Sequence, residues 1–129
     1  MGRIVAQVEL TNPLDPERSM LFSAFVDTGA GALVLPSSWK KRLGQFGSEE
    51  KIEFLLANNE VVTGMACGPV AIRIEGFRKI FNEVMFMDMA PGDDGEYQPL
   101  LGYVILEQAQ VAIDMLGHRL VPVKYIDCK

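Results

Sequence analysis

Apolar side chains at every second position dominate this chain and restrict it to a fold built from short β-strands. Near the N-terminus, Ile4, Ala6 and Val8 follow this period of two, which is typical of a strand with one buried face. Turn residues separate further segments of this kind at regular spacing, and short helices are expected only at 39–43 and 104–109. We therefore predict a mostly β fold, a small barrel or sandwich of largely antiparallel strands.

The individual elements can be placed from the same pattern. A hairpin tip is expected at Ala57-Asn58-Asn59, and Ser38 is expected to cap the first helix, which Gly44 ends. The expected strands cover residues 4–9, 20–26, 33–35, 52–56, 60–65, 70–74, 80–87, 111–115 and 120–123.

Length and charge restrict the class of protein. The 129 residues fit one domain over residues 1–129. A net charge of −5 argues against nucleic-acid partners. No apolar run approaches the roughly 20 residues of a membrane span, and the N-terminus becomes polar by Gln7, unlike a signal peptide. Because there are only two cysteines, we expect a cytoplasmic protein with free thiols and no membrane association.

Several catalytic classes are excluded by the residues that the chain lacks. His118 is its single histidine, too few for a zinc site built on several histidines. No serine lies in a Gly-x-Ser-x-Gly segment, and no glycine-rich phosphate loop occurs. We expect no metal and no cofactor, which leaves carboxylate chemistry or no chemistry at all.

Asp27 is the carboxylate that most needs an explanation. It directly follows the apolar segment Phe22–Val26 and precedes Thr28-Gly29-Ala30-Gly31. A carboxylate at the end of a buried strand loses hydration unless it finds hydrogen-bond donors. The two glycines permit a tight turn that brings backbone N–H groups close to it. The segment therefore indicates either a functional carboxylate or an aspartate that only stabilises a turn.

Two separate segments resemble those of a known family. Asp27-Thr28-Gly29-Ala30, followed by Leu33-Val34-Leu35-Pro36, resembles the active-site segment of the retropepsin-like aspartic proteases. Leu100-Leu101-Gly102, then Leu106 and the strand Ala112-Ile113-Asp114, resembles the family's second conserved element. With the hairpin between them, their order matches the family over nearly the whole chain.

The resemblance implies a single-domain retropepsin-like β-barrel with a flap hairpin and one or two short helices. It implies an aspartic endopeptidase that hydrolyses peptide bonds with an activated water. Because the chain has one Asp-Thr-Gly, a complete site requires a homodimer in which each subunit contributes Asp27. The partners would then be a second copy and a protein or peptide substrate, with no metal or cofactor.

The same resemblance assigns supporting roles. Thr28 would hydrogen-bond across the two-fold axis, and Gly29 and Ala30 would complete the active-site loop. Leu100, Leu101 and Gly102 would pack against this loop. The residues expected to bind substrate or form the flap are Gly31, Leu56, Ala57, Asn58 and Asn59.

This sequence also departs from the retroviral members. Gly31 and Ala32 stand where retroviral members carry acidic residues, and the hairpin tip lacks their glycine-rich sequence. The segment Ile52–Gly68 looks closer to bacterial and cellular relatives. The C-terminal residues 121–129 are expected to form a dimer sheet with the N-terminal strand, as termini do in the family.

Two alternatives remain open at this point. One is a catalytically silent protein of the same fold that binds peptides or only dimerises, because a fold does not determine a function. The other is an unrelated β-barrel that binds a ligand. Dimer geometry around Asp27 distinguishes all three hypotheses.

Overall fold

A computed structural model of the chain describes residues 3–125 and contains nine strands and two short helices. The strands are β1 (Val5–Asn12), β2 (Asp15–Val26), β3 (Leu33–Pro36), β4 (Ser48–Leu55), β5 (Val61–Ile74), β6 (Ile80–Met87), β7 (Leu100–Leu101), β8 (Val111–Asp114) and β9 (Arg119–Pro122). The helices are the 3₁₀ helix η1 (Ser37–Leu43) and the α-helix α1 (Tyr103–Gln108).

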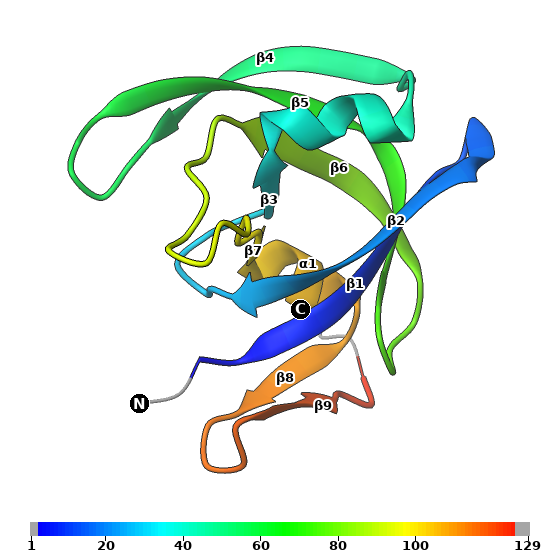
Figure 1. Cartoon of the computed structure of the whole chain (residues 1–129). Coiled ribbons are helices and arrows are strands. Elements are labelled where there is room, and N and C mark those ends of the chain that lie inside the picture. Colours follow the sequence, from blue (N-terminus) through cyan, green and yellow to red (C-terminus); the bar gives the residue numbers. More distant parts are fainter. Residues whose placement is uncertain (1–2, 126–129) are drawn as a thin grey trace.

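Seven of these strands form a sheet that curls into a barrel. Their order is β1-β2-β7-β3-β6-β5-β4, and an additional pairing of β1 with β5 closes the ring. β4 pairs only with the first half of β5, so the β4–β5 hairpin extends beyond the barrel (Figure 1). β8 and β9 form a separate two-stranded sheet. The prediction of a mostly β barrel with two short helices is confirmed.

The period of two in the sequence sorts side chains between the core and the surface. Along β1, Ala6, Val8 and Leu10 are buried while Val5, Gln7 and Glu9 are exposed. Each aliphatic or aromatic side chain removed from water contributes about 1.5–3 kcal/mol. The largest fully buried side chains are Phe86, Leu10, Leu33, Leu35, Leu43, Ile72, Ile74, Leu101, Ile105, Val8, Val70 and Val84.

The observed elements differ from the sequence prediction at several places; β4, for example, begins at Ser48 rather than Ile52, and β7 is not among the expected strands. The segments expected at 60–65 and 70–74 are one continuous strand, β5, because the pairing with β6 shifts register between Cys67 and Val70 and so accommodates Pro69. Ser38 does not cap η1, whose N-cap is Pro36 and has no side-chain hydrogen bond. β2 begins at Asp15, earlier than expected, because its first half pairs with β1 around a tight turn.

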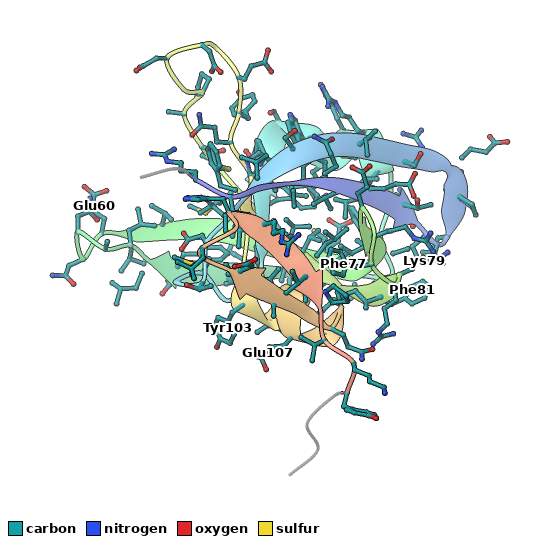
Figure 2. The ribbon with its side chains drawn as sticks, turned by 90° about the horizontal axis from the view of Figure 1, so that it is seen from below. Glu60, Phe77, Lys79, Phe81, Tyr103 and Glu107 are labelled. Atoms are coloured by element: carbon teal, nitrogen blue, oxygen red, sulfur yellow. The ribbon has the colours of Figure 1, made fainter. Side chains whose placement is uncertain are left out.

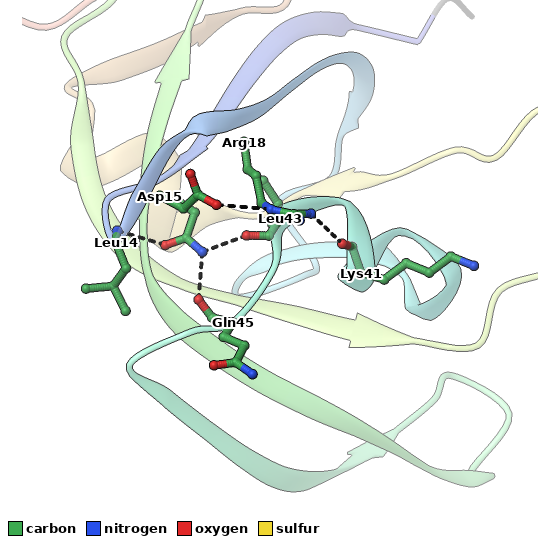
Figure 3. Close-up of polar contacts among 7 residues, drawn as sticks. Leu14, Asp15, Arg18, Lys41, Leu43 and Gln45 are labelled. Carbon is green, nitrogen blue, oxygen red and sulfur yellow. Dashed lines mark hydrogen bonds and ion pairs between the residues drawn. The ribbon is translucent and has the colours of Figure 1, made fainter.

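Asn12 is a buried polar residue that ties the β1–β2 turn to η1 (Figure 3). Its side-chain amide donates hydrogen bonds to the carbonyls of Leu43 at 2.6 Å and Gln45 at 2.7 Å, and its oxygen accepts one from the Leu14 N–H at 2.9 Å. Full hydrogen bonding offsets the cost of burying the amide.

Within the described residues, neither helix has the length and apolar character needed to cross a bilayer.

η1 ends where Gly44 adopts a φ of 80° and donates its N–H to the Lys41 carbonyl, as expected for a glycine at that position. The ring of Trp39 packs edge-on against Phe22 with centroids 5.4 Å apart, and Tyr97 also packs edge-on against Trp39, with centroids 6.1 Å apart. These contacts hold the 88–99 loop against the barrel.

Candidate active site

Asp27 lies directly after β2, where the chain leaves the barrel in a tight turn. Its backbone N–H donates to the Leu101 carbonyl at 3.0 Å, and its own carbonyl accepts from the Ala30 N–H at 3.1 Å. One side-chain oxygen, Oδ1, accepts a hydrogen bond from the Gly29 N–H at 2.9 Å. The carboxylate is partly exposed. It is therefore held in place by the backbone while it remains accessible to a ligand.

The loop that follows Asp27 is held by hydrogen bonds to the start of α1. The N–H groups of Gly102, Tyr103 and Val104 donate to the carbonyls of Ala32 at 3.0 Å, Ala30 at 2.9 Å and Gly31 at 3.1 Å, respectively. A helix N-terminus has free N–H groups that need acceptors, and here the loop carbonyls supply them. This explains why α1 has no side-chain cap. The loop and the helix consequently form one rigid unit.

Gly102 allows this close approach. A Cβ at this position would lie 2.5 Å from the carbonyl oxygens of Ala30 and Ala32 and 2.7 Å from the Ala32 nitrogen. All three are backbone atoms, which cannot rotate away as a flexible side chain does. The glycine of the Leu-Leu-Gly segment is therefore required by the contact with the loop.

An open groove of about 850 Å³ runs from Asp27 beneath the β4–β5 hairpin. Its floor comes from the loop after β2 and from β7, β3 and β6, and its roof from the end of β4 and the hairpin turn. The residues that line it are Asp27, Gly29, Ala30, Gly31, Ala32, Val34, Phe54, Leu55, Leu56, Ala57, Asn82, Glu83, Met85, Met87, Met89, Leu100, Val104 and Ile105. Most of them are apolar, so the groove suits an extended segment with apolar side chains.

A second cavity, of about 510 Å³, lies on the other side of Asp27. It is lined by Arg3, Ile4, Phe25, Val26, Asp27, Thr28, Leu100, Ile113, Met115 and His118. Asp27 and Leu100 are the two residues that line both hollows. The carboxylate is thus positioned between a groove under the hairpin and a cavity beside β8.

The β8–β9 hairpin forms one wall of that cavity and presents apolar side chains at its tip. Leu116 is 99% exposed and Met115 is 65% exposed. Asp114 stabilises the tip, since it accepts a hydrogen bond from the Gly117 N–H at 2.9 Å and pairs with Arg119 at 3.1 Å. The Gly117 N–H and then the Arg119 guanidinium hold the pKa of the Asp114 carboxyl below its usual range. Asp114 therefore has a structural role.

The structure brings most of the predicted site residues to the groove. Asp27, the small residues 29–31, Leu56, Ala57 and Leu100 all line it. Thr28 instead faces the second cavity, and Leu101 is fully buried beneath the loop. Asn58 and Asn59 are exposed in the hairpin turn and do not line the groove. The Asn58 side chain accepts a hydrogen bond from the Glu60 N–H at 3.0 Å, and Asn59 has a φ of 68°.

Several residues that line the groove are not among the predicted site residues, chiefly on β6. The sequence left open whether the methionines of segment 85–89 fill the core or form an apolar specificity pocket. Val84 and Phe86 point into the core, so the alternation puts Met85 and Met87 on the opposite face, where they line the groove. The same period of two puts these methionines on the face opposite the core, but the pairing of β6 with β3 is what brings that face to the groove. Glu83 could have been found as the one charged residue in the apolar segment 80–87.

Cys67 is fully buried in the core, as expected for a small apolar side chain. Burial raises the pKa of its thiol to about 11, with a further increase from the negative charges of Glu49 and Glu83. The thiolate is the reactive form of cysteine. Cys67 therefore serves in packing.

The fold is shared with a retroviral protease. A solved structure of EIAV protease, in complex with the inhibitor HBY-793, matches with a TM-score of 0.59 and 22% sequence identity. The match covers 83% of this chain and 88% of that protease. Neither the protein-family models nor the curated protein sequences match this sequence. The likeness is therefore one of architecture, and this chain has the retropepsin fold.

Proposed function

We propose that this chain is an aspartic endopeptidase that works as a homodimer, with the Asp27 carboxylates of both subunits around one water molecule. One carboxylate acts as the general base on the water while the other, protonated, polarises the carbonyl of the peptide bond. Two carboxylates that face the same water molecule cannot both be ionised, so the pair shares one proton. Aspartic proteases are a known example of such a pair. Cleavage should therefore be fastest at acidic pH.

The position of Asp27 is the observation that carries this proposal. Its carboxylate is anchored by the Gly29 N–H at 2.9 Å and opens onto an apolar groove beneath a hairpin. In this role the β4–β5 hairpin is a flap, with Leu56 and Ala57 facing an extended peptide and Asn58 and Asn59 at its exposed tip. Gly29, Ala30 and Gly31 leave room for the peptide backbone, and Leu100, Leu101 and Gly102 support the loop.

A second copy would complete the site from the side of the smaller cavity. Asp27 and Thr28 line this cavity together with apolar side chains of β2, β7 and β8, and the exposed Leu116 follows the lining residue Met115. A partner docked there would place its own Asp27 and Thr28 opposite these. The predicted pairing of residues 121–129 with the N-terminal strand stays part of this proposal, although residues 126–129 lie outside the described residues.

Leu116→Asp is expected to weaken the homodimer by tenfold or more, about 1.4 kcal/mol, because it puts a charge into an apolar contact. Sedimentation equilibrium measures the dimer dissociation constant, and circular dichroism checks the fold. Leu14→Asp is the matched control, since Leu14 is 67% exposed in the β1–β2 turn, away from the cavity. Equal dissociation constants for the two variants would contradict a dimer formed through the β8–β9 hairpin.

Cleavage of a diverse peptide library between about pH 4 and pH 7 tests the function. Products that appear with wild type and not with Asp27→Asn would support the protease. A stable dimer that binds library peptides without cleaving them would favour the alternative, a catalytically silent peptide-binding or dimerisation module.

We also propose that residues 1–129 form one retropepsin-like domain and that the protein is cytoplasmic. We further propose that this chain is related more closely to bacterial and cellular members of the family than to retroviral ones. This proposal has two supporting observations. It is supported by Gly31 and Ala32 after the active-site turn and by the polar Asn58-Asn59 hairpin tip.

A further inference from the structure

The groove is lined by a second carboxylate besides Asp27, that of Glu83. Among the described residues that line the groove, Asp27 and Glu83 are the charged ones, and none is basic. Glu83 is exposed on β6, and none of the three ion pairs within residues 3–125 includes it. An apolar groove with a carboxylate in its wall should favour a ligand with a positive charge at the matching position.

Hydrogen bonds fix the backbone that carries Glu83. The Asn82 amide donates to the Gln108 side-chain oxygen of α1 at 2.5 Å, and its own oxygen accepts from the Glu83 N–H at 2.7 Å. The nearby Arg78 guanidinium donates to the Gln108 backbone carbonyl at 2.8 Å, and Arg78 does not line the groove. Its charge is therefore directed to the end of α1, and Glu83 remains available to a ligand.

The strand order places Glu83 at a definite distance from Asp27. Going across the sheet, β2 is followed by β7, β3 and β6. Val26 pairs with Leu101 and Leu101 with Leu33, while Val34 pairs with Met85. This register puts Asp27, one residue after Val26, at the same level of the sheet as Ala32 and Glu83. Three steps of about 4.8 Å between strands give on the order of 14 Å. An extended peptide advances about 3.3 Å per residue, so this distance corresponds to about four residues.

We propose that Glu83 is a specificity-determining residue that selects a lysine or arginine about four residues from the cleaved bond. This inference rests on the proposed protease function. Met85, Met87 and Met89 line the same groove and accept apolar side chains of the peptide, and Glu83 pairs with its basic side chain. Since a homodimer has two Glu83 side chains, the preference applies on both sides of the cleaved bond.

Peptides with apolar residues at the cleaved bond test this subsite. Each peptide carries Lys, Gln or Glu at one position, two to six residues from the bond on either side. For wild type, we expect kcat/KM to be about three- to fivefold higher with Lys than with Gln near the fourth position, as typical for a partly exposed ion pair. Higher salt should reduce this ratio. Glu83→Gln should bring the ratio to about one, and Glu83→Lys should reverse the preference toward Glu.

Glu75→Gln is the matched control because it removes the same charge from the exposed turn between β5 and β6. Figure 2 shows this turn, marked by Phe77 and Lys79, at the end of the molecule opposite Glu60 in the β4–β5 hairpin. The control should retain the wild-type preference for Lys. Cleavage of Lys and Gln peptides at equal rates by wild type, or a preference that survives Glu83→Gln, would overturn the subsite.

Binding separates failure of the subsite from failure of the protease. If wild type cleaves none of these peptides, fluorescence anisotropy of labelled Lys and Gln peptides decides the matter. Tighter binding of the Lys peptide that Glu83→Gln removes would support the subsite and overturn the protease. Equal binding of both peptides, or no binding, would overturn the subsite as well.

Discussion

Asp27→Asn is expected to lower kcat by about 10²–10⁴-fold, the range that a general acid or base contributes. In a homodimer the substitution removes both carboxylates at once, so no base remains to activate the water. The asparagine side-chain oxygen can still accept the hydrogen bond that Gly29 donates to Asp27 at 2.9 Å. The fold and the dimer should therefore persist, and the loss should appear in kcat with little change in KM.

Steady-state cleavage of one library-derived peptide measures this effect, with thermal unfolding as a check on the fold. Asp93→Asn is a suitable control because Asp93 is exposed in the 88–99 loop and does not line the groove. Activity in Asp27→Asn within threefold of wild type would show that the water is activated by another group.

Gly102→Ala is expected to lower the free energy of unfolding by about 3 kcal/mol or more, the upper range for overpacking a buried site. The new methyl group would sit 2.5 Å from the carbonyl oxygens of Ala30 and Ala32, so the loop or α1 must move. The move would also disrupt the three hydrogen bonds that the N–H groups of Gly102, Tyr103 and Val104 donate to the loop. Activity should fall with stability, because the same loop carries Asp27.

Urea denaturation measures the loss, and Gly31→Ala is the matched control. A Cβ at Gly31 would meet the Tyr103 ring at 3.9 Å, an ordinary contact, so its cost should stay below about 1 kcal/mol. Equal stability of the two variants would contradict the account of Gly102 as the contact point between helix and loop.

The sequence was sufficient to predict most of the strands, because a period of two or a short apolar run marks them, whereas the two-residue strand β7 was not among those expected. It also identified the loop at Asp27 and the Leu100-Leu101-Gly102 segment, which the structure brings together through the Leu101 carbonyl and the Gly102 N–H. The tight turn after Asp27 was also expected from the sequence, because local spacing determines its geometry.

Contacts between distant strands could not be predicted in the same way. The shift in register that makes β5 continuous depends on pairing with β6 rather than on the residues near Pro69. The groove wall at Met85 and Met87 depends on β6 lying beside β3, a parallel pairing between residues 51 positions apart, such as Val34 and Met85. The second cavity depends on where the β8–β9 hairpin folds back, which no local pattern specifies.

Mixing wild-type and Asp27→Asn subunits tests most directly whether two chains share one site. After subunit exchange at equal amounts, about one quarter of the dimers carry two intact Asp27 residues. If two chains share one site, activity should follow the square of the wild-type fraction. The mixture should then show about a quarter of the activity of the same total amount of wild-type protein. Activity that falls in direct proportion, to about one half, would show that each chain works with its own Asp27 and would contradict the shared site.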